Sequence, residues 1–251
     1  MDDNLHPTST MRPIVTGYHE DFTPAWSPDG QWIAYHSHRS PTPVASYHSE
    51  GSTDDIYIRR YSPPPSEEIR LTDFGWEAGS PDWSPDGRQI VFSSWEKGKA
   101  PQASKPWTVT IDMETGKPLN ATRLPLPEPI RTTEELAWSP KGDEIAAIEG
   151  TGEAPRTIWI ISADGGKADK LVEYRSLAYG GLDWTPDGKT IIYSGLSGDQ
   201  MQLHAVQRSG GSPQQLTPDP ANLLHPQVSP DGNWIACTRV EARKELWKLK
   251  L

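Results

Sequence analysis

Five near-copies of one eleven-residue pattern run through this chain, and this repeat constrains the fold more than any other sequence feature. The copies are AWSPDGQWIAY from Ala25, DWSPDGRQIVF from Asp82, AWSPKGDEIAA from Ala137, DWTPDGKTIIY from Asp183 and QVSPDGNWIAC from Gln227. Their first residues are 57, 55, 46 and 44 positions apart. A period of this length indicates one supersecondary unit repeated five times.

Each copy predicts two strands joined by a tight turn. In SPDG, proline fixes φ at the second turn position, aspartate tolerates the third, and glycine takes the left-handed conformation of a bulged hairpin. The aspartates at 29, 86, 187 and 231 could be read as a catalytic series, but Lys141 takes the corresponding place in the third copy. A shared role in the turn explains these positions better than shared catalysis.

Two further strands are predicted in each unit. A third strand carries an aromatic residue or histidine at one position, namely Tyr57, Trp107, Trp159, His204 and Trp247, and in the first four units IRLT, TRLP, DKLV and QQLT follow as short fourth strands. Four strands per repeat are typical of a propeller blade. The sequence therefore predicts an all-β fold, a five-bladed propeller of four-stranded antiparallel blades.

The last unit stops at its third strand, in ELWKLKL, so its fourth strand has to come from elsewhere. RPIVTG, Arg12–Gly17, matches IRLT in type, and we expect it to complete the last blade and close the ring, which removes exposed edges. The predicted organisation is a disordered tail, 1–11, and one propeller domain, 12–251, with blades at 18–73, 74–126, 127–174, 175–218 and 219–251.

Charge and composition exclude several partners. The net charge of −10 and the absence of a Lys/Arg run argue against nucleic acid. No apolar run approaches the roughly 20 residues that span a bilayer, and MDDNLHPTST has no signal-peptide apolar core. The single cysteine, Cys237, takes the position of Tyr35 and Phe92 in other copies, which predicts a buried core thiol.

PAWSPDGQWIAYHSHR and SPDWSPDGRQIVFSSW resemble the repeats of the TolB β-propeller family, and the resemblance extends from Arg12 to the end of the chain. It implies a periplasmic or secreted domain that serves as a protein-interaction module, as the lid of a serine peptidase, or as a carbohydrate-active enzyme. The chain departs from TolB in having five repeats instead of six and no preceding α/β domain. It also lacks GxSxG, so the lid interpretation requires a separate hydrolase domain.

Strand order separates two faces. The SPDG turns lie on one face. The opposite face, here called the long-loop face, carries the connections between blades. It also carries two long loops, HRSPTPVASYHSEGSTDD and SWEKGKAPQASKP. Long loops on a rigid scaffold are where binding is expected. Trp76 and Trp95, the two tryptophans that the repeat does not require, map to this face and could stack on a sugar or anchor a peptide, or could pack the loop.

Charged residues at the blade connections add further candidates. The predicted ligand-binding set is Trp76, Trp95, Glu77, Arg131, Glu135, Tyr179 and His225. Paired carboxylates there could perform the acid–base chemistry of glycoside cleavage, or could belong to a solvated rim. No residue is assigned as catalytic.

Three histidines could hold a divalent metal ion, because ring closure makes the first and last blades neighbours. These are His19, His38 and His225, although a solvated strand end would show the same pattern. The sequence favours a non-catalytic recognition module that binds a protein, carbohydrate or small ligand on the long-loop face. The alternatives are a carbohydrate lyase or glycosidase at the channel mouth, with or without a metal, and a lid domain for a hydrolase.

Overall fold

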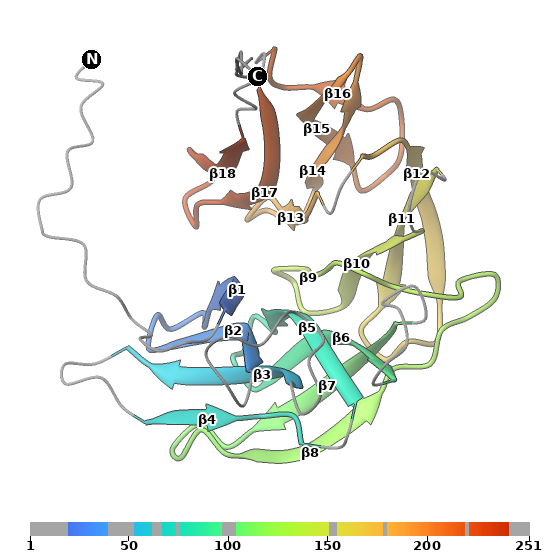
Figure 1. Cartoon of the computed structure of the whole chain (residues 1–251). Coiled ribbons are helices and arrows are strands. Elements are labelled where there is room, and N and C mark those ends of the chain that lie inside the picture. The colour runs from blue at the N-terminus through green and yellow to red at the C-terminus, as the bar shows by residue number, and fades with distance from the viewer. Residues whose placement is uncertain are drawn as a thin grey trace, which may run out of the picture.

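The computed structural model describes residues 20–39, 53–61, 67–73, 76–96, 104–150, 155–177, 180–218 and 221–240. Within these ranges five antiparallel sheets follow one another around a common axis (Figure 1). Residues 12–17, predicted to close the ring, lie outside the described residues, and so do His19, Tyr179 and Trp247.

The strands of each sheet pair in sequence order, with the first strand nearest the axis. The first sheet contains β1 (Glu20–Trp26), β2 (Trp32–Arg39), β3 (Thr53–Arg60) and β4 (Glu68–Arg70). The second contains β5 (Trp76–Trp83), β6 (Gln89–Glu96), β7 (Lys105–Ile111) and β8 (Pro118–Arg123). The third contains β9 (Leu136–Trp138), β10 (Glu144–Glu149), β11 (Arg156–Ser162) and β12 (Ala168–Tyr174). The fourth contains β13 (Leu182–Trp184), β14 (Thr190–Ser197), β15 (Gln200–Gln207) and β16 (Gln214–Gln215).

The fifth sheet is partial. Within the described residues it contains β17 (Asn222–Val228) and β18 (Ile235–Val240). The prediction of an all-β propeller with four-stranded antiparallel blades is thus confirmed for four sheets, with part of a fifth. No helix long and apolar enough to cross a bilayer occurs in the described ranges.

The SPDG turns show why the motif recurs. In the first copy the Ser27 hydroxyl and the Gln31 backbone N–H both donate to Oδ1 of Asp29, at 2.6 and 2.9 Å. These hydrogen bonds lower the pKa of Asp29. Asp86, Asp187 and Asp231 accept the same pair of bonds in their own turns. The turn interpretation of the four aspartates therefore agrees with the structure.

The apolar core lies between neighbouring sheets. One cluster joins the first and second sheets through residues such as Ile56 and Phe92, and another joins the third and fourth through Ile158 and Tyr193. The prediction of a buried Cys237 is wrong, because this thiol is exposed. Within the described residues β18 pairs only with β17, so the remaining surface of β18 is left uncovered.

A glycine outside the SPDG turns fixes a contact between the second and third sheets. Gly165, between β11 and β12, has φ of +79°, and an added Cβ would lie 2.5 Å from the backbone oxygen of Pro125. Gly165→Ala is expected to cost about 3 kcal/mol, because the strain of a left-handed residue adds to overpacking. Gly210, with φ of +90° and no atom within 4 Å of its Cβ position, is the control in urea denaturation. Equal losses in the two alanine variants would show that Pro125 does not matter.

Candidate functional site: the axial cavity

The five inner strands surround a cavity of about 510 Å³. Each inner strand begins toward the long-loop face and ends at its SPDG turn, so equivalent residues of the five repeats lie at similar depths along the axis. Two such sets line the cavity. Residues three positions before the motif tryptophan, or before Val228 in the last copy, form the upper ring, nearer the long-loop face: Thr23, Ser80, Glu135, Gly181 and His225. Residues one position before it form the lower ring: Ala25, Asp82, Ala137, Asp183 and Gln227.

The upper ring owes its geometry to bulges in the inner strands. Thr23, Ser80 and His225 have φ of 47°, 53° and 51°, where residues other than glycine are uncommon, and each precedes a proline. The pairing register of each strand shifts at the same point. A bulge re-aims a side chain. The three bulges therefore place three non-glycine side chains at corresponding places on the axis.

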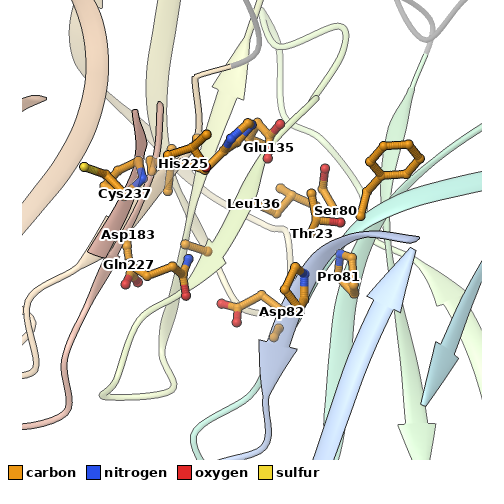
Figure 2. Close-up of a pocket in the computed structure, with 18 of the residues that line it drawn as sticks. Thr23, Ser80, Pro81, Asp82, Glu135, Leu136, Asp183, His225, Gln227 and Cys237 are labelled. Atoms are coloured by element: carbon orange, nitrogen blue, oxygen red, sulfur yellow. The ribbon is translucent and has the colours of Figure 1, made fainter. Parts of the chain in front are cut away.

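Glu135 and His225 are the two ionisable residues of the upper ring. Figure 2 shows their side chains side by side in the cavity, although they come from the third and fifth blades. Burial raises the pKa of Glu135, while the His225 imidazole and a hydrogen bond from the Ser80 hydroxyl act in the opposite direction. Gly181 lies against His225, since a Cβ there would be 2.9 Å from the His225 Cα.

The lower ring joins the blades together. Asp82 accepts hydrogen bonds from the backbone N–H groups of Trp83, at 2.9 Å, and of Trp138 in the next blade, at 2.6 Å. Asp183 repeats this arrangement with Trp184 and Val228, both at 2.7 Å. Burial raises the pKa of Asp82 to about 7 and that of Asp183 to about 6, and the Asp183 charge also raises the pKa of Asp82.

These two aspartates predict a pH dependence of stability. Because their pKa values are raised in the folded state, the folded chain binds more protons than the unfolded chain between about pH 4 and pH 7. The free energy of unfolding should therefore fall as pH rises through this window, by at most about 1.4 kcal/mol per pH unit for each group. Urea denaturation from pH 5 to pH 8 measures the slope. Asp82→Asn should flatten it, whereas Asp187→Asn, at a turn aspartate with a lowered pKa, should leave it unchanged.

The predicted binding residues divide into two groups in space. Glu135 and His225 both line the cavity, as expected for residues near the channel mouth. Trp76, Glu77 and Trp95 lie together on the second sheet: the Trp95 indole donates to Oε2 of Glu77 at 2.6 Å, and Trp76, which is 39% exposed, packs against Trp107. Glu77 is buried, so it supports Trp95 rather than facing solvent.

The remaining predicted residues are not brought together with this site. Arg131 is exposed on the third blade, where its backbone N–H donates to Glu149, and it is not among the described residues that line the cavity. Tyr179 lies outside the described ranges. No residue set in the described ranges was recognised as a cluster of three or more potential metal ligands.

His38 already has a partner for one ring nitrogen. Its Nδ1 lies 2.8 Å from Oδ1 of Asp54, and Nε2 of His36 lies 3.0 Å from the same oxygen. Burial acts to raise the pKa of Asp54, but its hydrogen bonds and charge interactions with the two histidines outweigh burial and lower it. Since His19 is outside the described residues, metal binding by His19, His38 and His225 stays a prediction.

Several residues of the cavity were missed by sequence reasoning. Thr23 and Ser80 precede prolines three residues before a motif tryptophan, a signal that His225-Pro226 shares and that predicts the bulges. Asp82 and Asp183 belong to the repeat itself. Their alternation with Ala25 and Ala137 at the same position was the available signal that this position makes different contacts in different blades.

Comparisons with known proteins agree with the fold. The family model PD40, TolB beta propeller domain, matches residues 80–250. The structure of a putative TolB from Agrobacterium tumefaciens superposes with a TM-score of 0.66 at 23% identity, over 92% of this chain and 74% of that one.

Two curated relatives are described as peptidases. The chain is 28% identical to "Uncharacterized peptidase YuxL" of Bacillus subtilis over 84% of its own length, and 30% identical to "Dipeptidyl-peptidase 5" of Porphyromonas gingivalis over 61%. It spans only 28% and 21% of those relatives.

Proposed function

Because the chain belongs to the TolB β-propeller domain family, we propose that it is a recognition domain whose ligand enters the axial cavity from the long-loop face. The ligand group that enters contacts Glu135 and His225. The single observation that carries this proposal is the cavity of about 510 Å³ with polar side chains of five repeats directed at it. That volume lies within the range of small-molecule sites, about 300–1,000 Å³. It suits a small molecule or one protruding segment of a protein.

The charges of the lining favour a cationic group. The described residues around the cavity include the carboxyl groups of Glu135, Asp82 and Asp183 and one imidazole, but no lysine or arginine. A cation near a buried carboxylate replaces lost hydration and favours its ionised form. The exposed part of Trp76, on the same side of the second blade as the upper ring, offers an apolar contact for the rest of the ligand. Arg131 and Tyr179 remain proposed contacts at the rim.

Binding of spermidine, a flexible aliphatic cation, tests the proposal, with citrate as an anionic counterpart. Isothermal titration at pH 7.5 should detect spermidine and not citrate. Glu135→Gln should weaken spermidine binding about tenfold or more, since a charge-assisted hydrogen bond is lost. Glu114→Gln, at an exposed position between β7 and β8, is the matched control and should have no effect. If Glu135→Gln and Glu114→Gln bind spermidine equally well, the binding site does not lie in the cavity.

A second candidate is a lid over a hydrolase domain, favoured by the two relatives described as peptidases. Since the chain spans about a quarter of each, the candidate requires an adjoining hydrolase domain in a longer natural protein. It predicts that a fluorophosphonate probe labels such a longer protein isolated from its source, but does not label these 251 residues alone. An unlabelled longer protein would contradict it.

The alternative of a carbohydrate lyase or glycosidase stays a prediction. Glu134, the neighbour of Glu135, is engaged by Arg156 at 2.7 Å and so is committed to an ion pair in the described structure. A location in the periplasm or outside the cell likewise remains a proposal from the family resemblance.

Completion of the fifth blade by residues 12–17 is part of the same proposal. The other sheets support it, because each has four strands and residues 12–17 resemble their short fourth strands in type. Hydrogen exchange should find the amides of 12–17 protected at least a hundredfold more than those of 1–11, as expected for a strand beside a tail. Equal exchange of the two segments would show that they do not form the missing strand.

A further inference from the structure

Four successive blade junctions use one of two repeated hydrogen bonds. Where the lower ring holds alanine, its backbone oxygen accepts a bond from the indole of the next blade: Trp83 Nε1 donates to Ala25 at 3.2 Å, and Trp184 Nε1 donates to Ala137 at 3.1 Å. Where the lower ring holds aspartate, its carboxylate accepts the backbone N–H of Trp138 or Val228. Each lower-ring residue thus contacts the motif position of the following blade.

The fifth junction, between the fifth and first blades, has a residue at each of the two positions that form this contact elsewhere. Its lower-ring residue is Gln227, and the motif position that follows around the ring is Trp26 of the first blade. Gln227 pairs with Ala236 just as Ala25 pairs with Ala34, so its backbone has the same place in its sheet. Trp26, however, is 51% exposed, whereas Trp83, Trp138 and Trp184 are buried.

Trp26 is surrounded by other exposed aromatic side chains, as at a packing interface whose second surface is not in place in the described structure. Its ring packs edge-on against Tyr61, with centroids 5.1 Å apart, and Tyr61 is itself exposed. Phe22, on the same inner strand, is 40% exposed, and Trp234 of the fifth blade is 69% exposed. Large apolar side chains thus remain uncovered on both blades that flank this junction. Figure 1 shows the first and fifth sheets as the two ends of the described arc.

We infer that Trp26 docks on the fifth sheet of the same chain, with its Nε1 donating to the backbone oxygen of Gln227 and its backbone N–H donating to the side-chain oxygen of Gln227. Glutamine supplies both acceptors that alanine and aspartate supply separately at the other junctions. The fifth sheet of the same chain is the binding partner of Trp26, because the other four junctions are formed by successive blades of this chain. This inference depends neither on the ligand nor on which strand completes the fifth blade.

Closure of this junction also defines the cavity. Phe22, Ala25, Gln227 and Cys237 line the cavity from the two sides of the seam. With Trp26 docked, the wall between the first and fifth blades becomes continuous. Access to the upper ring then runs along the axis and no longer between the blades.

Fluorine NMR of the full chain labelled with 5-fluorotryptophan tests the inference directly. The resonance lost in Trp26→Phe identifies Trp26, and its shift between H₂O and D₂O reports its exposure to solvent. We expect a shift as small as that of Trp83, while the resonance of Trp76, which is 39% exposed and lies on the second sheet away from this junction, should show a larger one. A large shift for Trp26 in the monomer would overturn the inference. So would a small shift that appears only when light scattering detects a dimer, since the occupant would then be a second copy.

Thermal denaturation gives an independent measurement. Trp26→Phe removes the indole N–H while keeping an aromatic ring, and it should lower the melting midpoint by about 2–4 °C, as expected for the loss of one buried hydrogen bond. Trp83→Phe, which loses the established bond to Ala25, should produce a shift of the same size. Trp76→Phe, in a partly exposed position on the second sheet, is the control outside the junction. A Trp26→Phe midpoint equal to that of the wild type would contradict docking.

Discussion

Arg156→Leu is expected to lower the free energy of unfolding by about 3–5 kcal/mol, because it leaves the carboxylate of Glu134 buried without its counter-charge. Arg156 and Glu134 are 3% and 6% exposed, and their closest nitrogen and oxygen atoms are 2.7 Å apart. The pair joins the connection that enters the third blade to its strand β11. In a domain of this size the loss corresponds to a fall of about 10 °C or more in the melting midpoint.

Two companion variants make this result specific. Arg156→Leu combined with Glu134→Leu should recover most of the loss, because removing both charges also removes the cost of burying them. Lys170→Leu breaks an exposed pair with Glu173, whose closest nitrogen and oxygen atoms are 2.8 Å apart, and should cost less than about 1 kcal/mol. If Arg156→Leu and Lys170→Leu cost the same, burial of the first pair is not what makes it matter.

The same variant carries a second large effect, on the pH dependence of stability. Burial raises the pKa of Glu134 even though Arg156 acts in the opposite direction. Without the guanidinium the pKa should rise further, so the folded variant takes up a proton that the unfolded chain, with an ordinary glutamate, does not hold at neutral pH. The destabilisation by Arg156→Leu should therefore be smaller at pH 5 than at pH 8.

Urea denaturation of the wild type and the variant at both pH values measures this difference. The expected change is on the order of 1–3 kcal/mol, since one proton contributes at most about 1.4 kcal/mol per pH unit. The double variant with Glu134→Leu is the control, because it has no carboxyl group at this position to titrate. A pH-independent loss in Arg156→Leu would show that lost packing outweighs the unpaired charge.

The fold could be predicted because its determinants are local. Each turn of this type is specified by four adjacent residues, and the apolar strand that follows it, as in Ile90 to Phe92, is buried in the first four copies. The partial fifth blade marks the limit of this reasoning. Which segment supplies the fourth strand of this blade depends on contacts between the two ends of the chain and not on any one repeat.

The site was predicted only in part, because it is formed by residues from different blades, and the sequence does not show which of these residues lie close together in space. Glu135 and His225 were identified from their place near the channel mouth, and the structure brings them together across two blades. Asp82 and Asp183 escaped notice because they stand inside the repeat, where sequence periodicity suggests a structural role. For Trp95 the sequence left ligand stacking and packing of the loop as alternatives, and the hydrogen bond from its indole to Glu77 is a contact that no spacing reveals.

The upper ring has a consequence for engineering. Its five positions come from five different blades, and the hydrogen bonds between lower-ring residues and the following blades do not use their side chains. Four of them, at 23, 80, 135 and 225, already hold four different residue types in this chain. Gly181 is the exception, because a Cβ there would lie 2.9 Å from the His225 Cα, which leaves no room for a side chain. A library confined to those four codons would therefore vary the chemistry of the axis while leaving the scaffold as it is.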